Sequence, residues 1–204
     1  MKTLIWDLDG TLVDSYERIT KVTQEVLKPY RAFTIEEIHN KVIETSVVSF
    51  VTNQAEDLGL DINELFIHYK ALTDQIAASD YKLIENAKEV LKHYLDLGCK
   101  HYIYTHRGLS TYDILEAHGI REWFVDILTS DDGLKRKPDP DALNYLIEKY
   151  SLDKEETYYI GDRSLDVLCG KAAGLKTVYI GKDKTIDADV VVSEINHIKR
   201  YISF

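Results

Sequence analysis

The chain has 204 residues, of which 45% are hydrophobic and 29% charged, and its formal net charge is -10 at pH 7. These values are ordinary for a globular chain that can build one full core, or a core with a small second domain. The acidic balance argues against nucleic acid as a partner, because phosphate backbones attract basic surfaces. It also means that a phosphorylated ligand needs a local cationic pocket.

Hydropathy and cysteine content bear on the compartment. No stretch approaches the ~18 apolar residues of a membrane helix. The apolar run at the amino terminus is too short for a signal peptide, since Asp7 interrupts it. Cys99 and Cys169 fit no CxxC metal or redox pattern and are interpreted as buried thiols. We therefore expect a cytoplasmic protein with no membrane partner.

The first predicted element is a buried strand at residues 3–7, where a short apolar run ends in polar residues. Residues 15–80 then show helical patterns only. Pro29 stops the first helix, and capping boxes at Thr34 and Asp61, each with Glu three residues later, predict two further helix starts. This stretch is interpreted as an inserted, all-helical cap domain.

Helices and strands alternate from residue 84 onward, which predicts an α/β fold with a Rossmann-like parallel sheet and helices on both faces. Residues 1–14 and 81–204 then form the core domain. Ligands of such sheets bind at the carboxyl edge, over which we expect the cap. The predicted helices cover 86–97, 110–118, a segment opening at 139–141, 164–173 and 193–203, and the predicted strands cover 101–104, 125–129, 157–160, 176–180 and 189–192.

The segment Asp7-Leu8-Asp9-Gly10-Thr11 follows the first strand directly, so its carboxylates are expected at the sheet edge. Gly10 allows a sharp turn close to a ligand. A calcium loop is the competing interpretation, but Thr11 and Leu12 do not supply the next ligand and glycine of such a loop. One aspartate of this pair can act as a nucleophile and the other as an acid.

Asp162 and Asp166 follow the strand at 157–160, where the simplest interpretation is a helix cap and a solvated side chain. Near Asp7 and Asp9, however, they crowd negative charge. Two unit charges ~4 Å apart at an effective dielectric of ~20 repel by ~4 kcal/mol. A divalent cation relieves this repulsion, and carboxylate oxygens without nearby His or Cys favour Mg²⁺ over Zn²⁺.

Thr105 closes a strand and offers its hydroxyl to a phosphate oxygen, and Lys137 lies in a proline-stiffened loop as a point charge for the same group. Each signal is weak alone, because strand-end threonines and solvated lysines are common. Lys135 and Arg136 compete for the role of Lys137. Together, the four segments supply the groups needed to move a phosphoryl group.

With these four segments in this order, the chain resembles the haloacid dehalogenase-like hydrolase superfamily along essentially its whole length. It is most similar to the phosphoglycolate-phosphatase-like branch, which has a helical cap after the first strand. The resemblance implies that Asp7 attacks phosphorus to form an aspartyl phosphate. It also implies that Asp9 protonates the leaving oxygen and then activates water, while Thr105 and Lys137 hold the phosphoryl oxygens.

The resemblance further implies a Mg²⁺ ion held by Asp7, the backbone carbonyl of Asp9 and Asp162, with Asp166 supporting it directly or through water. Dehalogenases of the superfamily lack an acid at the position of Asp9 and need no metal, so its presence favours a phosphatase. Phosphomutases keep that acid but commonly carry an acidic residue where this chain has Gly161, which favours hydrolysis.

The chain departs from the common family pattern at His106-Arg107, where Asn or Gly-like residues are usual. These two residues, with Gly10 and Thr11, are the candidates for substrate binding. Arg107 is either an additional contact to a phosphate or carboxylate, or a salt-bridged surface residue.

The resulting hypothesis is a Mg²⁺-dependent phosphatase that acts on a small phosphorylated metabolite of the phosphoglycolate kind. We expect a monomer or a weak homodimer. The alternatives are a phosphomutase acting on a sugar phosphate and a non-catalytic protein that binds a phosphorylated ligand. Lys41, Arg18 and the segment Glu44-Thr45-Ser46 are the candidates within the cap for setting specificity.

Overall fold

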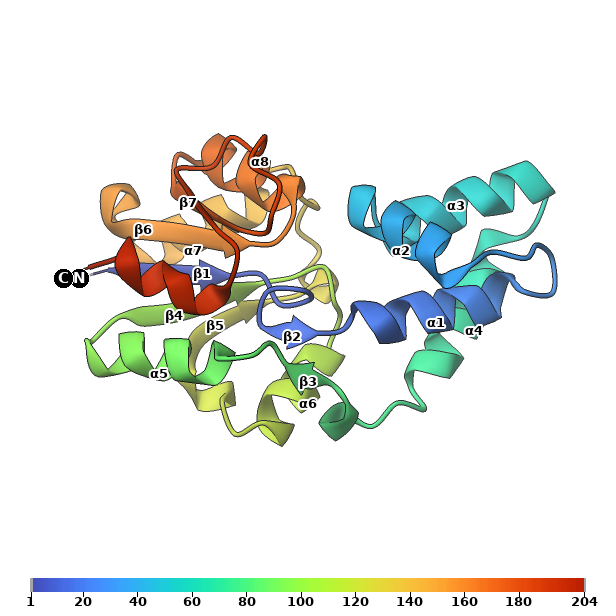
Figure 1. Ribbon diagram of the computed structural model, residues 1–204, viewed down its shortest axis with the longest axis horizontal. Helices are drawn as coiled ribbons and strands as arrows, with labels where there is room; N and C mark the ends of the chain where they lie inside the picture. The colour runs from blue at the N-terminus through green and yellow to red at the C-terminus, as the bar shows by residue number, and fades with distance from the viewer. Residues whose placement is uncertain (1, 204) are drawn as a thin grey trace. The chain divides into compact units, whose positions relative to one another are not determined.

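A computed structural model describes residues 2–203 and divides the chain into two compact units. The α/β unit comprises the residues up to Asp14 and those from Tyr81 onward, and the helical unit comprises Ser15–Asp80. Figure 1 shows both units. Each is described here by itself.

The α/β unit is built on a six-stranded parallel sheet with the strand order β5-β4-β1-β6-β7-β8. The first strand is therefore central, and the order reverses there, which is the place where open α/β sheets bind ligands. All four residues of β1 are buried. The strands are β1 (Thr3–Trp6), β4 (Lys100–Tyr104), β5 (Phe124–Leu128), β6 (Thr157–Gly161), β7 (Lys176–Ile180) and β8 (Val190–Val192).

Helices cover both faces of this sheet. Successive residues of β4 point to opposite faces, so the contacts of neighbouring residues tell which helix lies on which face. Tyr102 packs in a core cluster with Leu143 and Leu146, whereas the ring of its neighbour His101 hydrogen-bonds Leu91. α7 and α8 thus lie on one face and α5 on the other (Figure 1). The helices of this unit are α5 (Ala87–Asp96), α6 (Ser110–Ala117), α7 (Asp141–Tyr150) and α8 (Ser164–Ala173). The predicted fold class is confirmed.

A buried polar pair fixes the strand that leads into the candidate site. Trp6 donates its indole N–H to Nδ1 of His101 at 2.9 Å, and Nε2 of His101 lies 3.1 Å from the Leu91 carbonyl. The imidazole therefore carries its proton on Nε2 and is neutral, and both ring nitrogens have partners. Burial lowers the pKa of His101 to about 4.

Short elements complete the unit, and sequence patterns did not predict them. β2 (Val13–Asp14) pairs antiparallel with β3 (Lys82–Leu83), where the chain leaves the α/β unit and returns to it. Two residues are too few to carry a periodic signal. The short 3₁₀ helices are η1 (Ala78–Asp80, in the helical unit), η2 (Arg121–Trp123), η3 (Ser130–Asp132) and η4 (Lys154–Glu156).

The helix predicted at 193–203 is present in a shorter form. The segment forms a 3₁₀ helix, η5 (Ile195–Arg200). Ile195 and Ile198 are both buried, and their spacing of three matches the three residues per turn of that helix.

The helical unit contains α1 (Tyr16–Leu27), α2 (Ile35–Glu44), α3 (Val47–Leu58) and α4 (Ile62–Thr73). It has its own core, in which Val26 and Leu27 of α1 pack with Ile38, Val51 and Leu65 of the other three helices. An amphipathic helix buries its apolar stripe in this way, so the unit is compact without residues from the sheet.

The capping box predicted at Thr34 is confirmed, with the Glu37 amide donating to its hydroxyl at 3.2 Å and the Thr34 amide donating to the Glu37 carboxylate at 2.7 Å. At Asp61 the predicted box is replaced by a shorter cap. Its Oδ1 accepts from the backbone N–H of Asn63 at 2.8 Å and from the side-chain amide at 3.1 Å.

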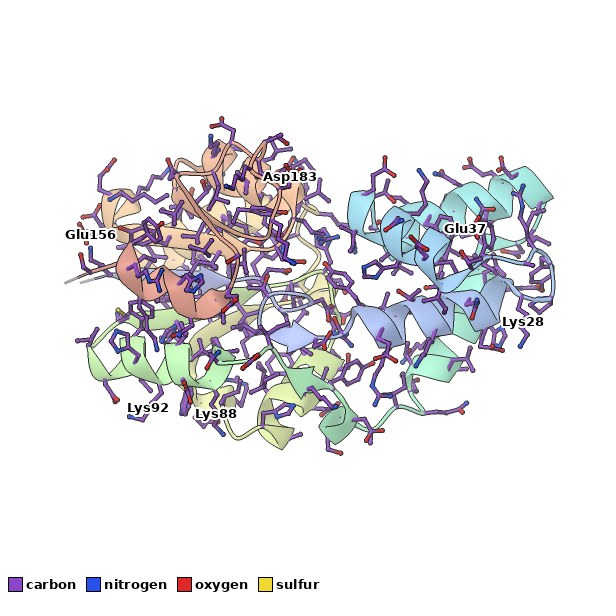
Figure 2. All side chains as sticks on the ribbon, in the orientation of Figure 1. Lys28, Glu37, Lys88, Lys92, Glu156 and Asp183 are labelled. Carbon is purple, nitrogen blue, oxygen red and sulfur yellow. The ribbon has the colours of Figure 1, made fainter. Side chains whose placement is uncertain are left out.

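The charged side chains of Glu37, Lys88 and Lys92 lie on the outside of their units, as Figure 2 shows. Within residues 2–203, the structure has no helix that is long and apolar enough to cross a membrane. Cys99 and Cys169 are free, buried thiols, as predicted.

Candidate active site

The parallel sheet brings the predicted segments to one edge. Asp7 follows β1, Thr105 follows β4, and Asp162 follows β6. Asp166 lies in the first turn of α8, and Lys137 lies in the loop before α7. The carboxyl ends of parallel strands meet at one edge of a sheet, so residues far apart in sequence become neighbours there.

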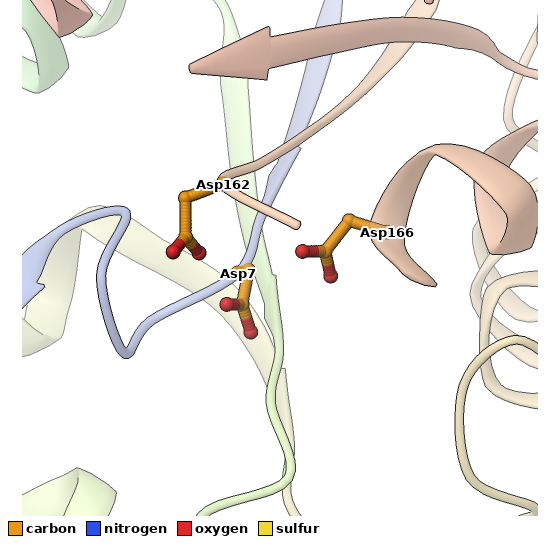
Figure 3. Close-up of side chains that lie close together, drawn as sticks. All are labelled: Asp7, Asp162 and Asp166. Carbon is orange, nitrogen blue, oxygen red and sulfur yellow. The ribbon is translucent and has the colours of Figure 1, made fainter. Parts of the chain in front are cut away.

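Three carboxylates converge at this edge. Asp7, Asp162 and Asp166 each offer an oxygen, and these oxygens lie within 4.8 Å of one another. Figure 3 shows the three side chains pointing toward one another from the ends of β1 and β6 and from the start of α8. Oδ2 of Asp7 is buried and has no hydrogen-bond partner. An acceptor of this kind, among hard oxygen donors, fits a divalent metal ion.

Lys137 is the cation of this cluster. Its Nζ donates to Oδ1 of Asp7 at 2.6 Å and to Oδ1 of Asp166 at 2.7 Å, and its side chain is fully buried. The ammonium also lies 4.9 Å and 5.4 Å from the ring centres of Tyr104 and Tyr159, within range of a cation–π interaction. The competing cations Lys135 and Arg136 are exposed.

The two aspartates that share Lys137 differ in their pKa. Burial raises the pKa of Asp7 to about 6, although the Lys137 charge opposes this shift. Burial also acts on Asp166, but Lys137 and other donors outweigh it and lower the pKa. Asp166 has the better set of donors, because the Arg163 amide and the Tyr159 hydroxyl each bond to it at 3.1 Å. These donors favour the charged form.

Lys137 remains charged in this setting. Burial alone lowers its pKa, but Asp166 and Asp7 outweigh that effect and raise it above the usual range. The site therefore holds a permanent cation against two carboxylates, with a third carboxylate next to them.

Gly161 makes room for this arrangement. A Cβ atom at this position would lie 2.3 Å from Cγ of Asp166, which no real structure tolerates. Glycine here lets the Asp166 carboxylate lie against the backbone of β6. The sequence suggested this position as a marker between family branches, and the structure gives it a steric role.

Gly10 and Thr11, predicted to bind substrate, form the turn after β1. Gly10 has a φ of 84°, in the left-handed region, and its amide donates to the Val13 carbonyl at 2.8 Å. The buried Thr11 hydroxyl donates to Oδ1 of Asp162 at 3.1 Å. This hydroxyl therefore orients one of the three converging carboxylates.

Thr105 and His106 link β4 to the lysine loop. The Thr105 hydroxyl is buried and accepts the backbone N–H of Arg107 at 3.1 Å. Nε2 of His106 accepts the backbone N–H of Lys137 at 2.9 Å. Burial, reinforced by the charges of Lys137 and Arg136, lowers the pKa of His106 to about 2, so the ring is neutral. His106 thus contacts the Lys137 backbone, a contact that sequence reasoning missed.

Arg107 forms a partly buried ion pair with Asp9. Its Nε lies 3.1 Å from both carboxylate oxygens, and its Nη2 lies 2.6 Å from Oδ1. The guanidinium lies 4.7 Å from the ring centre of Tyr81. The sequence offered a salt-bridged surface residue as one interpretation of Arg107. The salt bridge is present, but the Arg107 side chain is only 10% exposed and does not lie at the surface. Tyr81 carried no motif that could have predicted this contact.

Comparison with known proteins identifies the family to which the chain belongs. Residues 4–180 match the model of the haloacid dehalogenase-like hydrolase family, and the chain belongs to that family. It is similar to a phosphoglycolate phosphatase of Vibrio parahaemolyticus, with 29% identity over 187 residues that cover 85% of this chain and 81% of the relative. It is also similar to pyrophosphatase PpaX of Bacillus pumilus, with 29% identity over 87% of this chain and 82% of the relative.

Solved structures agree with this assignment. A hydrolase from Streptococcus pneumoniae is 31% identical, with a TM-score of 0.60 over 87% of this chain and 92% of that one. A haloacid dehalogenase superfamily hydrolase from Geobacter sulfurreducens is 20% identical and shares the fold, with a TM-score of 0.74 over 100% of this chain and 97% of that one. The chain is thus an enzyme, a haloacid dehalogenase-like phosphatase.

Proposed function

We propose that this phosphatase is Mg²⁺-dependent and hydrolyses a small phosphomonoester through an aspartyl-phosphate intermediate on Asp7. One observation carries the proposal most directly. Oδ2 of Asp7 is buried without a hydrogen-bond partner, whereas Oδ1 of the same group is held by Lys137 at 2.6 Å. A carboxylate that is oriented through one oxygen and unengaged at the other is suited to act as a nucleophile.

In the first step, a carboxylate oxygen of Asp7 attacks phosphorus. The new oxygen–phosphorus bond forms as the bond to the leaving oxygen breaks, and Asp9, which acts in its protonated form in this step, gives that oxygen a proton. Lys137 and Thr105 hold the phosphoryl oxygens and offset the charge that develops on them.

In the second step, a water molecule attacks the phosphorus of the aspartyl phosphate. Asp9, now without its proton, accepts one from the water, and the bond between phosphorus and Asp7 breaks. The products are inorganic phosphate and the original Asp7 carboxylate, so the protein returns to its starting state.

Asp7, the backbone carbonyl of Asp9 and Asp162 would hold the Mg²⁺ ion, with Asp166 supporting it directly or through water. The cluster of hard oxygens in Asp7, Asp162 and Asp166 supports this choice. A bound Mg²⁺ ion supplies positive charge against the phosphoryl oxygens and against the crowded carboxylates.

For the substrate, we propose a small phosphorylated metabolite of the phosphoglycolate kind, as in the Vibrio relative named above. The helical unit is proposed to take part in choosing it. In that unit Lys41 is ion-paired with Glu44 at 2.8 Å, and Nε of Arg18 donates to the Asp80 carbonyl at 3.1 Å. Their contacts within the unit make them weaker candidates than Arg107, which contacts Asp9 directly.

The test is phosphate release from phosphoglycolate, pyrophosphate, p-nitrophenyl phosphate and a hexose phosphate, each with Mg²⁺ and with EDTA. Wild type is compared with Asp7→Asn, which keeps the size of the side chain. We expect release that needs Mg²⁺, that is greatest for phosphoglycolate and that disappears in the variant. Rearrangement of the hexose phosphate without phosphate release would instead identify a phosphomutase, and binding without turnover would identify a phospho-ligand sensor.

A further inference from the structure

Arg107 is a pre-positioned cation in the candidate site. Its backbone N–H donates to the Thr105 hydroxyl at 3.1 Å, and its carbonyl accepts from the Ser130 amide at 3.0 Å. The ring of Tyr81 lies under its guanidinium, with 4.7 Å to the ring centre. Both ends of the residue are therefore fixed, and the side chain is not free to move to the surface.

Its partner Asp9 is fully engaged by this cation. Both carboxylate oxygens of Asp9 accept hydrogen bonds from the Arg107 guanidinium, in a forked arrangement. In the proposed function, Asp9 must contact the leaving oxygen of the substrate. At least one of its oxygens must then turn away from Arg107.

Turning away leaves a buried guanidinium without its counter-ion, which is unfavourable because little water reaches a side chain that is 10% exposed. A second anionic group on the substrate removes that cost. Guanidinium binds carboxylate and phosphate groups through the same fork that now holds Asp9.

Lys137, the fully buried cation of the site, already has two partners. Lys137 donates to Asp7 and Asp166, on the side of the group that is proposed to attack phosphorus. Arg107 contacts Asp9, the residue that is proposed to face the leaving oxygen. A chain with a net charge of -10 also repels a multiply charged ligand unless a local cation receives it.

We infer that Arg107 is a subsite for a second anionic group of the substrate, a carboxylate or a phosphate on the leaving-group side, which replaces Asp9 on the guanidinium. This inference rests on the proposed function and narrows its substrate class. The preferred substrate carries an anion besides the transferred phosphoryl group, and its binding releases Asp9 for proton transfer.

A binding experiment tests the subsite without relying on turnover. The first probe is the phosphonate analogue of phosphoglycolate in which CH₂ replaces the bridging oxygen. The second is propylphosphonate, in which a methyl group replaces its carboxylate, and the third is methylenebisphosphonate, which carries a second phosphonate. Calorimetric titrations with Mg²⁺ compare wild type, Arg107→Gln, Arg107→Lys and the control Arg136→Gln, which removes an exposed charge by the same substitution.

We expect wild type to bind the carboxylate probe or the bisphosphonate about 10- to 100-fold more tightly than propylphosphonate, as a charge-assisted fork provides. Arg107→Gln should reduce this preference to less than about threefold, and Arg107→Lys, which keeps the charge without the fork, should fall between them. Arg136→Gln should retain the preference. The tighter of the two doubly anionic probes identifies the second anion as carboxylate or phosphate.

Three results overturn the inference: no preference in wild type, no binding of any probe, or an equal loss for all probes in a folded Arg107→Gln protein. Thermal unfolding establishes folding, and Arg107→Lys replaces the glutamine variant if that protein does not fold. A failure of the proposed function would give a different result from a failure of the subsite. If the preference is present and depends on Arg107 but no phosphomonoester is hydrolysed, the subsite stands and the phosphatase proposal fails.

Discussion

Nζ of Lys137 lies 2.6 Å from Oδ1 of Asp7, although 130 positions separate the two residues in the sequence. The same ammonium lies 2.7 Å from Asp166, and all three side chains are buried. A lysine between two carboxylates both orients Asp7 and limits the repulsion between Asp7 and Asp166.

Replacement of the buried ammonium should disable the site and weaken the fold. In Lys137→Met, Asp7 and Asp166 lose their shared cation, so we expect phosphate release to fall at least about 100-fold. The free energy of unfolding should fall by about 3 kcal/mol, because one partner of a buried ion pair is removed. Steady-state kinetics and urea unfolding measure the two effects. Lys135→Met, which changes an exposed neighbour, should stay close to wild type in both, and equal behaviour of the two variants would contradict the assignment.

Replacement of Gly161 by alanine, the smallest residue with a side chain, should impair the site. In Gly161→Ala, the new Cβ would lie 2.3 Å from Cγ of Asp166, so that carboxylate must shift. We expect activity to fall at least about tenfold, because Asp166 is proposed to support the metal ion and a change next to a metal ligand typically costs this much. Gly108→Ala is the matched control, since its Cβ would lie 2.6 Å from the end of the exposed Asp131 side chain and 3.6 Å from the Ser130 hydroxyl, and the Asp131 side chain can move toward solvent. Similar activity in the two variants speaks against a positioning role for Gly161.

Metal addition should stabilise the protein through Asp162. Mg²⁺ at about a hundred times its Kd should raise the Tm of wild type by roughly 5 to 10 °C, because it binds only the folded state. Asp162→Asn should abolish most of this rise. Asp187→Asn removes a charge from a side chain that is 96% exposed and should retain it. A full Mg²⁺ response in Asp162→Asn, measured by differential scanning fluorimetry, excludes Asp162 as a ligand.

The protein should become less stable as the pH is lowered, because His101 is protonated only in the unfolded chain. Its pKa is about 4 in the folded protein and 6.5 ordinarily, so between these values the unfolded chain binds the proton and the folded chain does not. Unfolding is favoured as pH falls through that window. From pH 6.5 to pH 5, His101 should lower the free energy of unfolding by about 2 kcal/mol.

His101→Gln should remove the contribution of this ring to the pH dependence and leave that of His106, whose pKa is also lowered by burial, although the stability of the variant at neutral pH is lower. The exposed His93→Gln is the control and should keep the wild-type slope. Urea unfolding followed by tryptophan fluorescence suits this test, because Trp6 and Trp123 both lie in the α/β unit. An unchanged slope in His101→Gln shows that this ring is not protonated on unfolding.

Much of the fold was predictable because its strands are short apolar runs and its long helices have regular apolar spacing. β2 and β3 were not predictable, since a two-residue ladder is defined by pairing and not by pattern. The terminal helix was predicted without its type and with bounds that were too wide. Its apolar positions fit a 3₁₀ helix, and hydropathy alone did not separate the two helix types.

The candidate site was predictable in its residue types and less so in its contacts. Motif order placed Asp7 and Asp162 at strand ends, and parallel topology brought them together. The sequence favoured Lys137 and left Lys135 and Arg136 as rivals, and burial selects Lys137. The pairing of Asp9 with Arg107 was also missed, since it depends on a side-chain orientation across 98 positions.

The most direct test of the central claim is to trap the phosphoryl group on Asp7. Enzyme turning over phosphoglycolate or p-nitrophenyl phosphate with Mg²⁺ is quenched in acid within milliseconds, reduced with borohydride, digested with trypsin and sequenced by mass spectrometry. Reduction converts an aspartyl phosphate to homoserine, so we predict homoserine at position 7 in wild type and none in Asp7→Asn. Homoserine at Asp9 instead, or active turnover without any modified peptide, would contradict nucleophilic catalysis by Asp7.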